Sequence, residues 1–332
     1  MTSAETVAPD PLLGPRSPVP WCWVDGRWTS VGQTGLTVAT QALHYGTGVF
    51  EGIRSYWNAD DGLAYVVRLD DHVERFLRSC RLLRIDPGLS GAELHDLTIA
   101  LVERSGFCGD LYIRPLALKS RLLPGTPFGV GLSGVEDLIA LYAIPMPSRT
   151  IIDALSCSIS SWRRVPSEAL PPQAKITGSY VNVALAVDEA RSAGFDDAIL
   201  MNMRGTVAEA STSNVFSVSN GVLSTPSRDS DILPGITRAC VLELAKGSLG
   251  VEVRELPLLV PDLLSSDEVF LSGTGCELVS VTSIGGRPIG TGRPGPVTAQ
   301  LFDLYQAAVR GSDGAHAHWV TPVSVQHLPS DH

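Results

Sequence analysis

The chain has 332 residues, of which 44% are hydrophobic and 18% are charged. This is typical of a well-packed globular protein long enough for two domains. The formal net charge is −10 and the basic residues are scattered, which argues against a nucleic-acid-binding surface. The six cysteines lie far apart without a CxxC pair, so we expect reduced thiols and a cytoplasmic location. No signal peptide is expected, and apolar runs such as LIALYAI (138–144) are too short to cross a bilayer.

The first half of the chain is predicted to mix strands and helices. WCWVDGRWTS (21–30) has a DG turn between two short apolar runs, which is typical of a β-hairpin. DDHVERFLRSCRLLRI (70–85) and GAELHDLTIALVERSG (91–106) carry apolar residues at helical spacing. Further strands are predicted at 65–69, 111–118 and 137–144.

The second half is predicted to be richer in strands. Arg204-Gly205 and Asn220-Gly221 are turn signals for hairpins over 198–210 and 214–226. Helices are predicted from about 179 to 193 and directly after LPG (233–235), and a strand at 268–273. PMPSRT (145–150) is the linker candidate because its prolines interrupt strand-like sequence. The predicted parts are a flexible arm (1–20), a small N-terminal domain (21–144), the linker, a large C-terminal domain (151–311) and a tail (312–332).

One glycine pattern suggests a nucleotide site that the context excludes. Residues 129–134 spell GxGxxG. A dinucleotide site needs a strand before this motif and a helix after it, so that the pyrophosphate meets the start of the helix. Here LLPGTPF precedes the motif and the strand-like DLIALYAI follows it. We therefore predict a loop.

Lys175 and Glu209 are the strongest candidates for chemistry. A lysine that forms a Schiff base needs a neutral amine, obtained by burial or nearby positive charge. Lys175 lies just before a predicted helix and is one of only three lysines, although a solvent-exposed lysine is the usual alternative. Glu209 lies in a predicted strand between two alanines. A carboxylate there can hold the ring nitrogen of a pyridine cofactor, and an exposed strand glutamate is the alternative.

Three further motifs could bind a phosphate. LPGITR (233–238) opens a predicted helix whose backbone N–H groups and Thr237 hydroxyl would bind an anion. SGTG (272–275) ends a strand in a turn of small residues and could add Thr274. Arg75 in HVER (72–75) could add a guanidinium. Each has an ordinary alternative, namely a helix start, a glycine turn and a solvated arginine.

The order of these motifs resembles that of the fold-type IV pyridoxal phosphate enzymes, and most closely the branched-chain amino acid aminotransferases. HVER, AKITGSY, VAEASTSN, LPGITR and SGTG follow one another as in that family, and QALHYGTGVFEGIRSY (41–56) and LYIRPL (111–116) complete the match. The resemblance covers roughly residues 21 to 310. It implies an α/β (α+β) fold with a small N-terminal α/β domain, a larger barrel-like C-terminal α/β domain, and pyridoxal 5'-phosphate between them.

The resemblance also implies roles for individual residues. Lys175 would form the internal aldimine and shuttle the proton between Cα and C4′. Tyr180 would bind the phenolic oxygen, Glu209 the ring nitrogen, and Leu233 would pack against the ring. The implied phosphate ligands are Arg75, Ile236, Thr237 and Thr274. The implied substrate residues are Tyr45, Phe50, Gly52, Arg54, Tyr112, Arg114 and Gly275, with Arg114 receiving the second carboxylate of glutamate or 2-oxoglutarate and Thr274 and Gly275 offering backbone amides to a substrate carboxylate.

The implied activity is transfer of the amino group of leucine, isoleucine or valine to 2-oxoglutarate by at least a homodimer. In the dimer, a loop of the neighbouring subunit, here RLLPGTPFG (121–129), would roof each site. The linker is short, and STSN (211–214) resembles the serine-rich turn of D-amino acid aminotransferases. D-amino acid or amine transamination, or a pathway-specific 2-oxo acid, therefore remains an alternative. An aminodeoxychorismate lyase and a non-catalytic protein are further alternatives.

Overall fold

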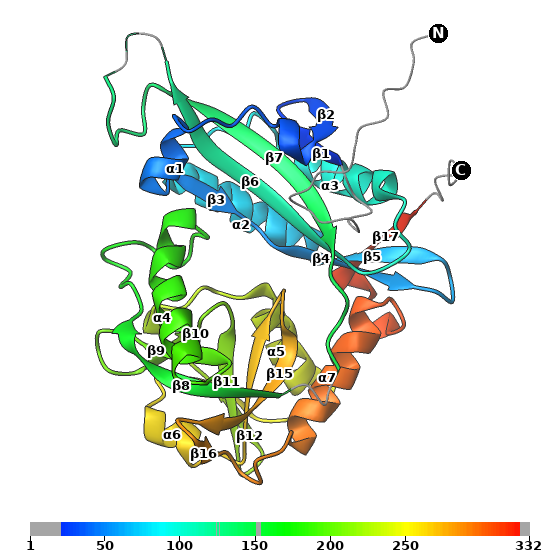
Figure 1. The fold of residues 1–332 in the computed structure, drawn as a ribbon. Coiled ribbons are helices and arrows are strands. Elements are labelled where there is room, and N and C mark those ends of the chain that lie inside the picture. The colour runs from blue at the N-terminus through cyan, green and yellow to red at the C-terminus, as the bar shows by residue number, and fades with distance from the viewer. Residues whose placement is uncertain (1–20, 124, 126, 151–153, 326–332) are drawn as a thin grey trace. The chain divides into compact units, whose positions relative to one another are not determined.

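The computed structural model describes residues 21–123, 125, 127–150 and 154–325 (Figure 1). The predicted arm at 1–20 lies outside the described residues, as do residues 124 and 126 of the predicted roof loop and the end of the predicted tail. The chain divides into two compact units, one formed by 1–147 with 318–332 and the other by 148–317. We call them unit 1 and unit 2.

Unit 1 is built on an eight-stranded sheet, and the neighbouring strands within its described residues all run antiparallel. The order is β17-β5-β4-β6-β7-β1-β2, and β3 pairs with β6. The strands are β1 (Trp21–Val24), β2 (Arg27–Ser30), β3 (Gly48–Phe50), β4 (Ile53–Asn58), β5 (Leu63–Val67), β6 (Leu111–Leu122), β7 (Val135–Pro145) and β17 (Val320–Ser324). The edge strand β17 comes from the predicted tail and pairs along the whole length of β5.

Two long helices of unit 1 pack against each other, and both also contact its sheet. The helices of this unit are α1 (Gln41–Tyr45), α2 (Leu69–Leu82) and α3 (Gly91–Ser105). α2 buries Val73, Phe76 and Cys80, the apolar stripe that the helical spacing predicts. α3 begins with a capping box between Ser90 and Glu93.

Unit 2 is built on a nine-stranded mixed sheet in the order β10-β9-β8-β15-β14-β11-β12-β13, with β16 paired to β15. The strands are β8 (Ala154–Arg163), β9 (Asp197–Met201), β10 (Val207–Ala210), β11 (Asn214–Ser219), β12 (Val222–Thr225), β13 (Val253–Glu255), β14 (Glu268–Gly273), β15 (Glu277–Ile284) and β16 (Arg287–Pro288). β10 contacts β11, to which the bend at residues 211–213 joins it, although the two are far apart in the strand order. The sheet therefore curls, as predicted for a barrel-like domain.

Helices cover this curled sheet. α4 (Tyr180–Ser192) contacts β8 and β9, whereas α5 (Ile236–Gly247) and α7 (Pro296–Val309) contact each other and β14. The remaining helix is α6 (Val260–Leu264), and the short 3-10 helices of the chain are η1 (Val31–Gln33), η2 (Thr177–Ser179), η3 (Arg228–Ser230) and η4 (Gly314–Trp319). None of the described helices combines the length and apolar content that crossing a lipid bilayer requires.

The structure confirms the predictions that were based on local sequence signals. All three predicted hairpins form, as β1–β2, β9–β10 and β11–β12. Gly106, which ends α3, has φ +61°, a conformation that glycine adopts without strain. The GxGxxG stretch lies in the connection between β6 and β7, as predicted for a loop.

Candidate active site

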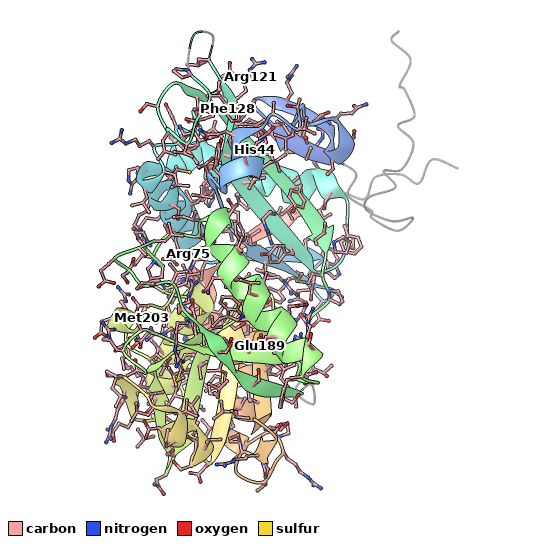
Figure 2. All side chains as sticks on the ribbon, turned by 60° about the vertical axis from the view of Figure 1, so that its left-hand side comes forward. His44, Arg75, Arg121, Phe128, Glu189 and Met203 are labelled. Atoms are coloured by element: carbon pink, nitrogen blue, oxygen red, sulfur yellow. The ribbon has the colours of Figure 1, made fainter. Side chains whose placement is uncertain are left out.

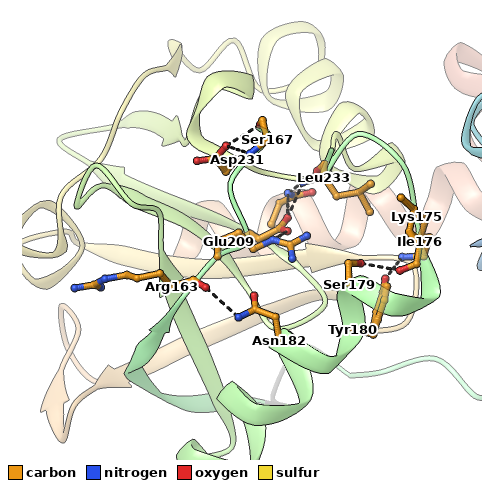
Figure 3. Close-up of polar contacts among 12 residues, drawn as sticks. Arg163, Ser167, Lys175, Ile176, Ser179, Tyr180, Asn182, Glu209, Asp231 and Leu233 are labelled. Atoms are coloured by element: carbon orange, nitrogen blue, oxygen red, sulfur yellow. Dashed lines mark hydrogen bonds and ion pairs between the residues drawn. The ribbon is translucent and has the colours of Figure 1, made fainter. Parts of the chain in front are cut away.

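Lys175 lies directly before η2 and α4, and its amine is directed at Tyr180. Lys175 Nζ donates a hydrogen bond to the Tyr180 hydroxyl at 2.6 Å and lies 5.3 Å from the centre of that ring (Figure 3). Lys175 is half-buried, between the buried residues Ala174 and Ile176. This environment differs from that of an exposed lysine and joins two of the residues that the sequence singled out.

Glu209 on β10 is a buried carboxylate with three donors. Arg164 Nε donates to Oε1 at 2.8 Å. The Leu233 backbone N–H and Asn214 Nδ2 donate to Oε2 at 3.0 and 3.2 Å. Glu209 and Leu233 face each other in Figure 3. The alternative of an exposed strand glutamate is therefore excluded.

The charge state of Glu209 depends on opposing influences. Burial raises the pKa of this carboxyl above its ordinary value, against the opposing effects of Arg164, the Leu233 N–H and the charge of Lys175. The Lys175 charge thus acts on the Glu209 carboxyl within unit 2.

The start of α5 is suited to an anion. Gly235 precedes the helix, and within the described residues no side chain caps its first N–H groups. A Cβ on Gly235 would lie 2.1 Å from Asn214 Oδ1, so only glycine fits. Ile236 and Thr237 form the first turn, and Thr237 is buried. The helix start therefore lies beside the group of donors around Glu209.

The turn after β14 carries Thr274 and Gly275. A Cβ on Gly273 would lie 3.1 Å from Ser213 Oγ and 3.2 Å from the Thr212 carbonyl oxygen, so this turn packs tightly on the turn after β10. Cys276 Sγ lies 3.0 Å from Ser213 Oγ. A cavity of about 620 Å³ opens beside these turns, with Tyr180 in its lining.

In unit 1, four of the predicted substrate residues share one face of the sheet, namely Phe50, Arg54, Tyr112 and Arg114. Arg54 is paired in register with Tyr112, and Arg114 follows two residues later on the same strand. Arg114 Nη2 donates to the Tyr112 hydroxyl at 3.0 Å, and its guanidinium lies 4.4 Å from the centre of the Phe50 ring. A Cβ on Gly52 would lie 2.0 Å from the Tyr112 hydroxyl, so Gly52 is required for this approach.

Arg54 and Tyr45 have other contacts. Arg54 is buried, donates to the Met146 carbonyl oxygen at 2.8 Å and lies 3.9 Å from Asp110. Tyr45, at the end of α1, lies with its ring centre 6.3 Å from that of Phe128 in the predicted roof loop. Figure 2 labels Phe128 and His44 in the same region of unit 1, and their ring centres are 6.1 Å apart.

Arg75, a predicted phosphate ligand on α2, is labelled in Figure 2 and forms a buried ion pair with Glu51. Its Nε and Nη2 donate to the Glu51 carboxylate at 2.7 and 2.8 Å. His72 Nδ1 lies 2.8 Å from the same carboxylate. The alternative of a solvated arginine is excluded. Any phosphate bound by Arg75 would have to approach an edge of the guanidinium other than the one facing Glu51.

Sequence reasoning missed four of these polar residues, namely Glu51, His72, Arg164 and Asn214. Glu51, His72 and Asn214 lie inside motifs that were recognised, but nothing in their spacing shows what they bind. Arg164 is the last residue of SSWRR (160–164), where an arginine usually indicates a solvated strand end. Only contacts formed in the folded chain reveal these roles. Arg164 and Glu209, for example, are 45 residues apart in the sequence.

In sequence, this chain is similar to known aminotransferases. Residues 48–284 match the family model described as amino-transferase class IV. A probable branched-chain-amino-acid aminotransferase from Aquifex aeolicus (strain VF5) is 39% identical over 309 residues, which span 91% of this chain and 96% of that protein.

Solved structures of branched-chain aminotransferases are similar to this chain in both sequence and fold. The branched-chain aminotransferase of Thermoproteus uzoniensis with norvaline is 37% identical, has a TM-score of 0.85 and is matched over 92% of this chain and 99% of that chain. The branched-chain amino acid aminotransferase of Thermobaculum terrenum in its PLP-form (holo-form) is 36% identical, has a TM-score of 0.86 and is matched over 92% of this chain and 98% of that chain. The predicted fold type and the family resemblance are thereby confirmed.

Proposed function

Because the chain belongs to the class IV aminotransferase family, we propose that it transfers the amino group of a branched-chain L-amino acid to 2-oxoglutarate with pyridoxal 5'-phosphate as cofactor. The observation that carries this proposal is the Lys175–Tyr180 hydrogen bond in the same unit as the buried Glu209 carboxylate. The solved relatives named above are branched-chain aminotransferases, and one of them is in its PLP-form.

The donor set of unit 2 suits this cofactor. Lys175 would attach its aldehyde, Tyr180 would bind its phenolic oxygen, and Glu209 its ring nitrogen. The phosphate would meet Ile236 and Thr237 at the uncapped start of α5, where backbone N–H groups favour an anion. Leu233 would pack on the ring, and Thr274 and Arg75 would add further phosphate contacts. When bound, the cofactor supplies an electron sink for the bonds at the substrate Cα.

Lys175 is the proposed proton-transfer group. Its neutral amine can take the proton from the substrate Cα and deliver it to C4′ of the cofactor. Tyr180, 2.6 Å away, keeps the amine directed to one place during that transfer. Glu209, held by three donors, keeps its carboxylate in one orientation.

The sheet face of unit 1 supports the dual substrate preference. Phe50 and Tyr112 offer apolar ring surface to a branched side chain, and Arg114 between them offers a guanidinium to the second carboxylate of the acidic substrate. We propose that Tyr45, Gly52 and Arg54 shape this surface, and that Gly275 offers its amide to a substrate carboxylate.

We also propose that the protein works as a homodimer in the cytoplasm. Val38, Leu43, Phe128 and Val130 of unit 1 are strongly exposed apolar residues, a feature typical of protein interfaces. The six cysteines all lie in the described part of the chain and none forms a disulfide there, which suits a reducing compartment.

The first test is the absorption spectrum of the purified protein. A visible cofactor band should be lost on adding L-leucine and restored by 2-oxoglutarate, because the two substrates drive opposite half-reactions. Lys175→Ala should lose turnover while retaining some cofactor. A band that ignores leucine, isoleucine and valine but responds to D-alanine or simple amines would contradict the substrate assignment, and unchanged turnover in Lys175→Ala would contradict the role of that lysine.

A further inference from the structure

Three separate segments of unit 2 hold the Glu209 carboxylate. Arg164 Nε donates to Oε1 at 2.8 Å, and the Leu233 N–H and Asn214 Nδ2 donate to Oε2 at 3.0 and 3.2 Å. Rotation of the carboxylate would break at least one of these bonds. The orientation of Glu209 is therefore set by residues other than Glu209 itself.

Each side-chain donor is held in turn. Arg164 is 7% exposed, and its backbone N–H donates to the Met201 carbonyl oxygen at 2.9 Å. Asn214 Nδ2 donates also to the Leu233 carbonyl oxygen at 3.0 Å, and Gly235 lies so close to its Oδ1 that a Cβ would not fit. The clamp on Glu209 is thus anchored at both oxygens.

The two oxygens differ in the charge of their donors. Oε2 accepts from neutral groups, whereas Oε1 accepts from the guanidinium of Arg164, so this bond is charge-assisted. Burial raises the pKa of Glu209, and Arg164 and Lys175 are the cations that oppose this rise. A carboxylate that shares a proton with a ring nitrogen competes with it for that proton, so a cation on the carboxylate moves the proton toward the nitrogen.

We infer that Arg164 is a positioning residue that holds Glu209 ionised and so keeps the shared proton on the ring nitrogen of the cofactor. This inference rests on the proposed function, in which Glu209 faces that nitrogen. Arg164 acts through Glu209, while Asn214 and the Leu233 N–H orient the other oxygen. The strength of the electron sink is then a property of the Arg164–Glu209 pair rather than of Glu209 alone.

The test uses the full-length protein loaded with pyridoxal phosphate labelled with ¹⁵N in the ring. In Arg164→Met, the ¹⁵N resonance should move from the position of a protonated nitrogen toward that of an unprotonated one. Exchange of the leucine Cα proton with solvent should slow by about tenfold or more, as expected for losing a hydrogen bond between charged groups. Arg164→Lys keeps a cation and should restore the resonance in part.

Two controls separate this role from a structural one. Arg238 is also buried in unit 2 and pairs with Glu255 at 2.7 Å. Arg238→Met should lower the melting temperature and leave the resonance in place. In a Glu209→Gln background, Arg164→Met should cause no further shift, because the group through which it acts is gone.

The outcomes distinguish the role of Arg164 from the assignment of Glu209. A resonance that shifts in Glu209→Gln but not in Arg164→Met would overturn the inference and leave the proposed function intact. A resonance unchanged in Glu209→Gln would overturn the assignment of Glu209 and the inference with it. Should Arg164→Met fail to fold, Arg164→Gln, which retains an N–H donor without the charge, must show the same shift, and its absence would overturn the inference.

Discussion

Two buried carboxylates, Glu51 in unit 1 and Glu209 in unit 2, each pair with an arginine. Burial acts to raise the pKa of both groups, but the net shift is downward for Glu51 and upward for Glu209. Glu51 accepts two hydrogen bonds from Arg75 and is also in contact with His72, so its pKa falls well below the ordinary value. Glu209 has one bond from Arg164 and two neutral donors, so burial dominates. The number of charged hydrogen bonds decides the sign.

Glu51→Gln should reduce the acid sensitivity of the fold. The folded-state pKa of Glu51 lies below its ordinary value of 4.5, so the ion pair contributes its full stability above that pH and loses it as the pH falls. Burial lowers the pKa of His72 against the opposing effect of Glu51, so this histidine also costs stability on acidification, and His72→Gln is introduced into both the parent and the variant to remove its titration from the comparison. At neutral pH the variant should be less stable by about 3 kcal/mol, because Arg75 loses its buried partner. Urea unfolding between about pH 6 and about pH 3.5 should show a smaller fall in unfolding free energy than in the parent.

An exposed ion pair provides the matched control for Glu51. Arg121 and Glu136 pair on the surface of unit 1 with side chains 74% and 40% exposed. Glu136→Gln should leave the pH dependence close to that of the parent, because exposed pairs contribute little. Equal pH dependence in the parent and in Glu51→Gln would contradict the account of the buried pair.

Arg114→Met should separate the two half-reactions. Loss of a guanidinium that binds a carboxylate removes a charged hydrogen bond worth about 2 kcal/mol, or roughly thirtyfold. The KM for 2-oxoglutarate should therefore rise by about that factor, whereas the KM for leucine should change little, because in the proposed site its side chain would meet the Phe50 and Tyr112 rings. Steady-state kinetics with each substrate varied in turn measure both values. An equal rise for leucine would place Arg114 at the α-carboxylate instead.

At the scale of elements, the sequence predicted what local signals encode. The hairpins follow from their turn residues, and α2 and α3 follow from apolar spacing and caps. β15 and α7 were not predicted. The start of α7 is stabilised from a distant strand, since Glu268 on β14 accepts hydrogen bonds from the Val297 and Thr298 N–H groups at 2.9 and 2.8 Å. A cap supplied 29 residues earlier leaves no local signal.

Glu268→Ala should therefore loosen α7. The carboxylate is buried and also accepts from the Thr298 hydroxyl at 2.7 Å, so three donors would lose their acceptor. We expect a loss of about 2 kcal/mol in unfolding free energy, and faster hydrogen exchange confined to the first turn of α7. The local cap Ser90 of α3 is the comparison, for which Ser90→Ala should cost about 1 kcal/mol. Unchanged exchange in α7 would show that its packing alone holds the helix.

At the scale of the whole molecule, short motifs in a fixed order were enough to predict the family, the fold type and the cofactor. The ion pairs that orient Arg75 and Glu209 join residues 24 and 45 positions apart, and the strand orders of both sheets depend on equally distant pairings. β17 illustrates the limit, because its five residues pair with β5 more than 250 residues earlier. Contacts of that range depend on the folded topology and not on local propensity.

Self-association is the property of the whole molecule that the exposed surface of unit 1 predicts. We define the α1 patch as Val38, Leu43, Phe128 and Val130, with exposed fractions of 89%, 69%, 67% and 68%. The segments that carry it lie side by side, because His44 Nε2 lies 2.8 Å from the Val38 carbonyl oxygen and Gln41 Nε2 donates to the Gly129 and Gly131 carbonyl oxygens at 3.2 and 2.8 Å. Such a patch is costly to leave in water.

Phe128→Lys combined with Leu43→Lys should therefore shift the protein from dimer toward monomer, because burying two charges in an apolar interface is unfavourable. Light scattering during size-exclusion chromatography measures the mass directly. Met203→Lys is the matched control, since Met203 is 67% exposed at the β9–β10 turn of unit 2 and lies outside the patch. A parent protein that is monomeric at micromolar concentration, or a double variant that stays dimeric, would contradict the proposed interface. Monomerisation with loss of turnover but an intact cofactor band would indicate that the neighbouring copy completes the substrate side of the site.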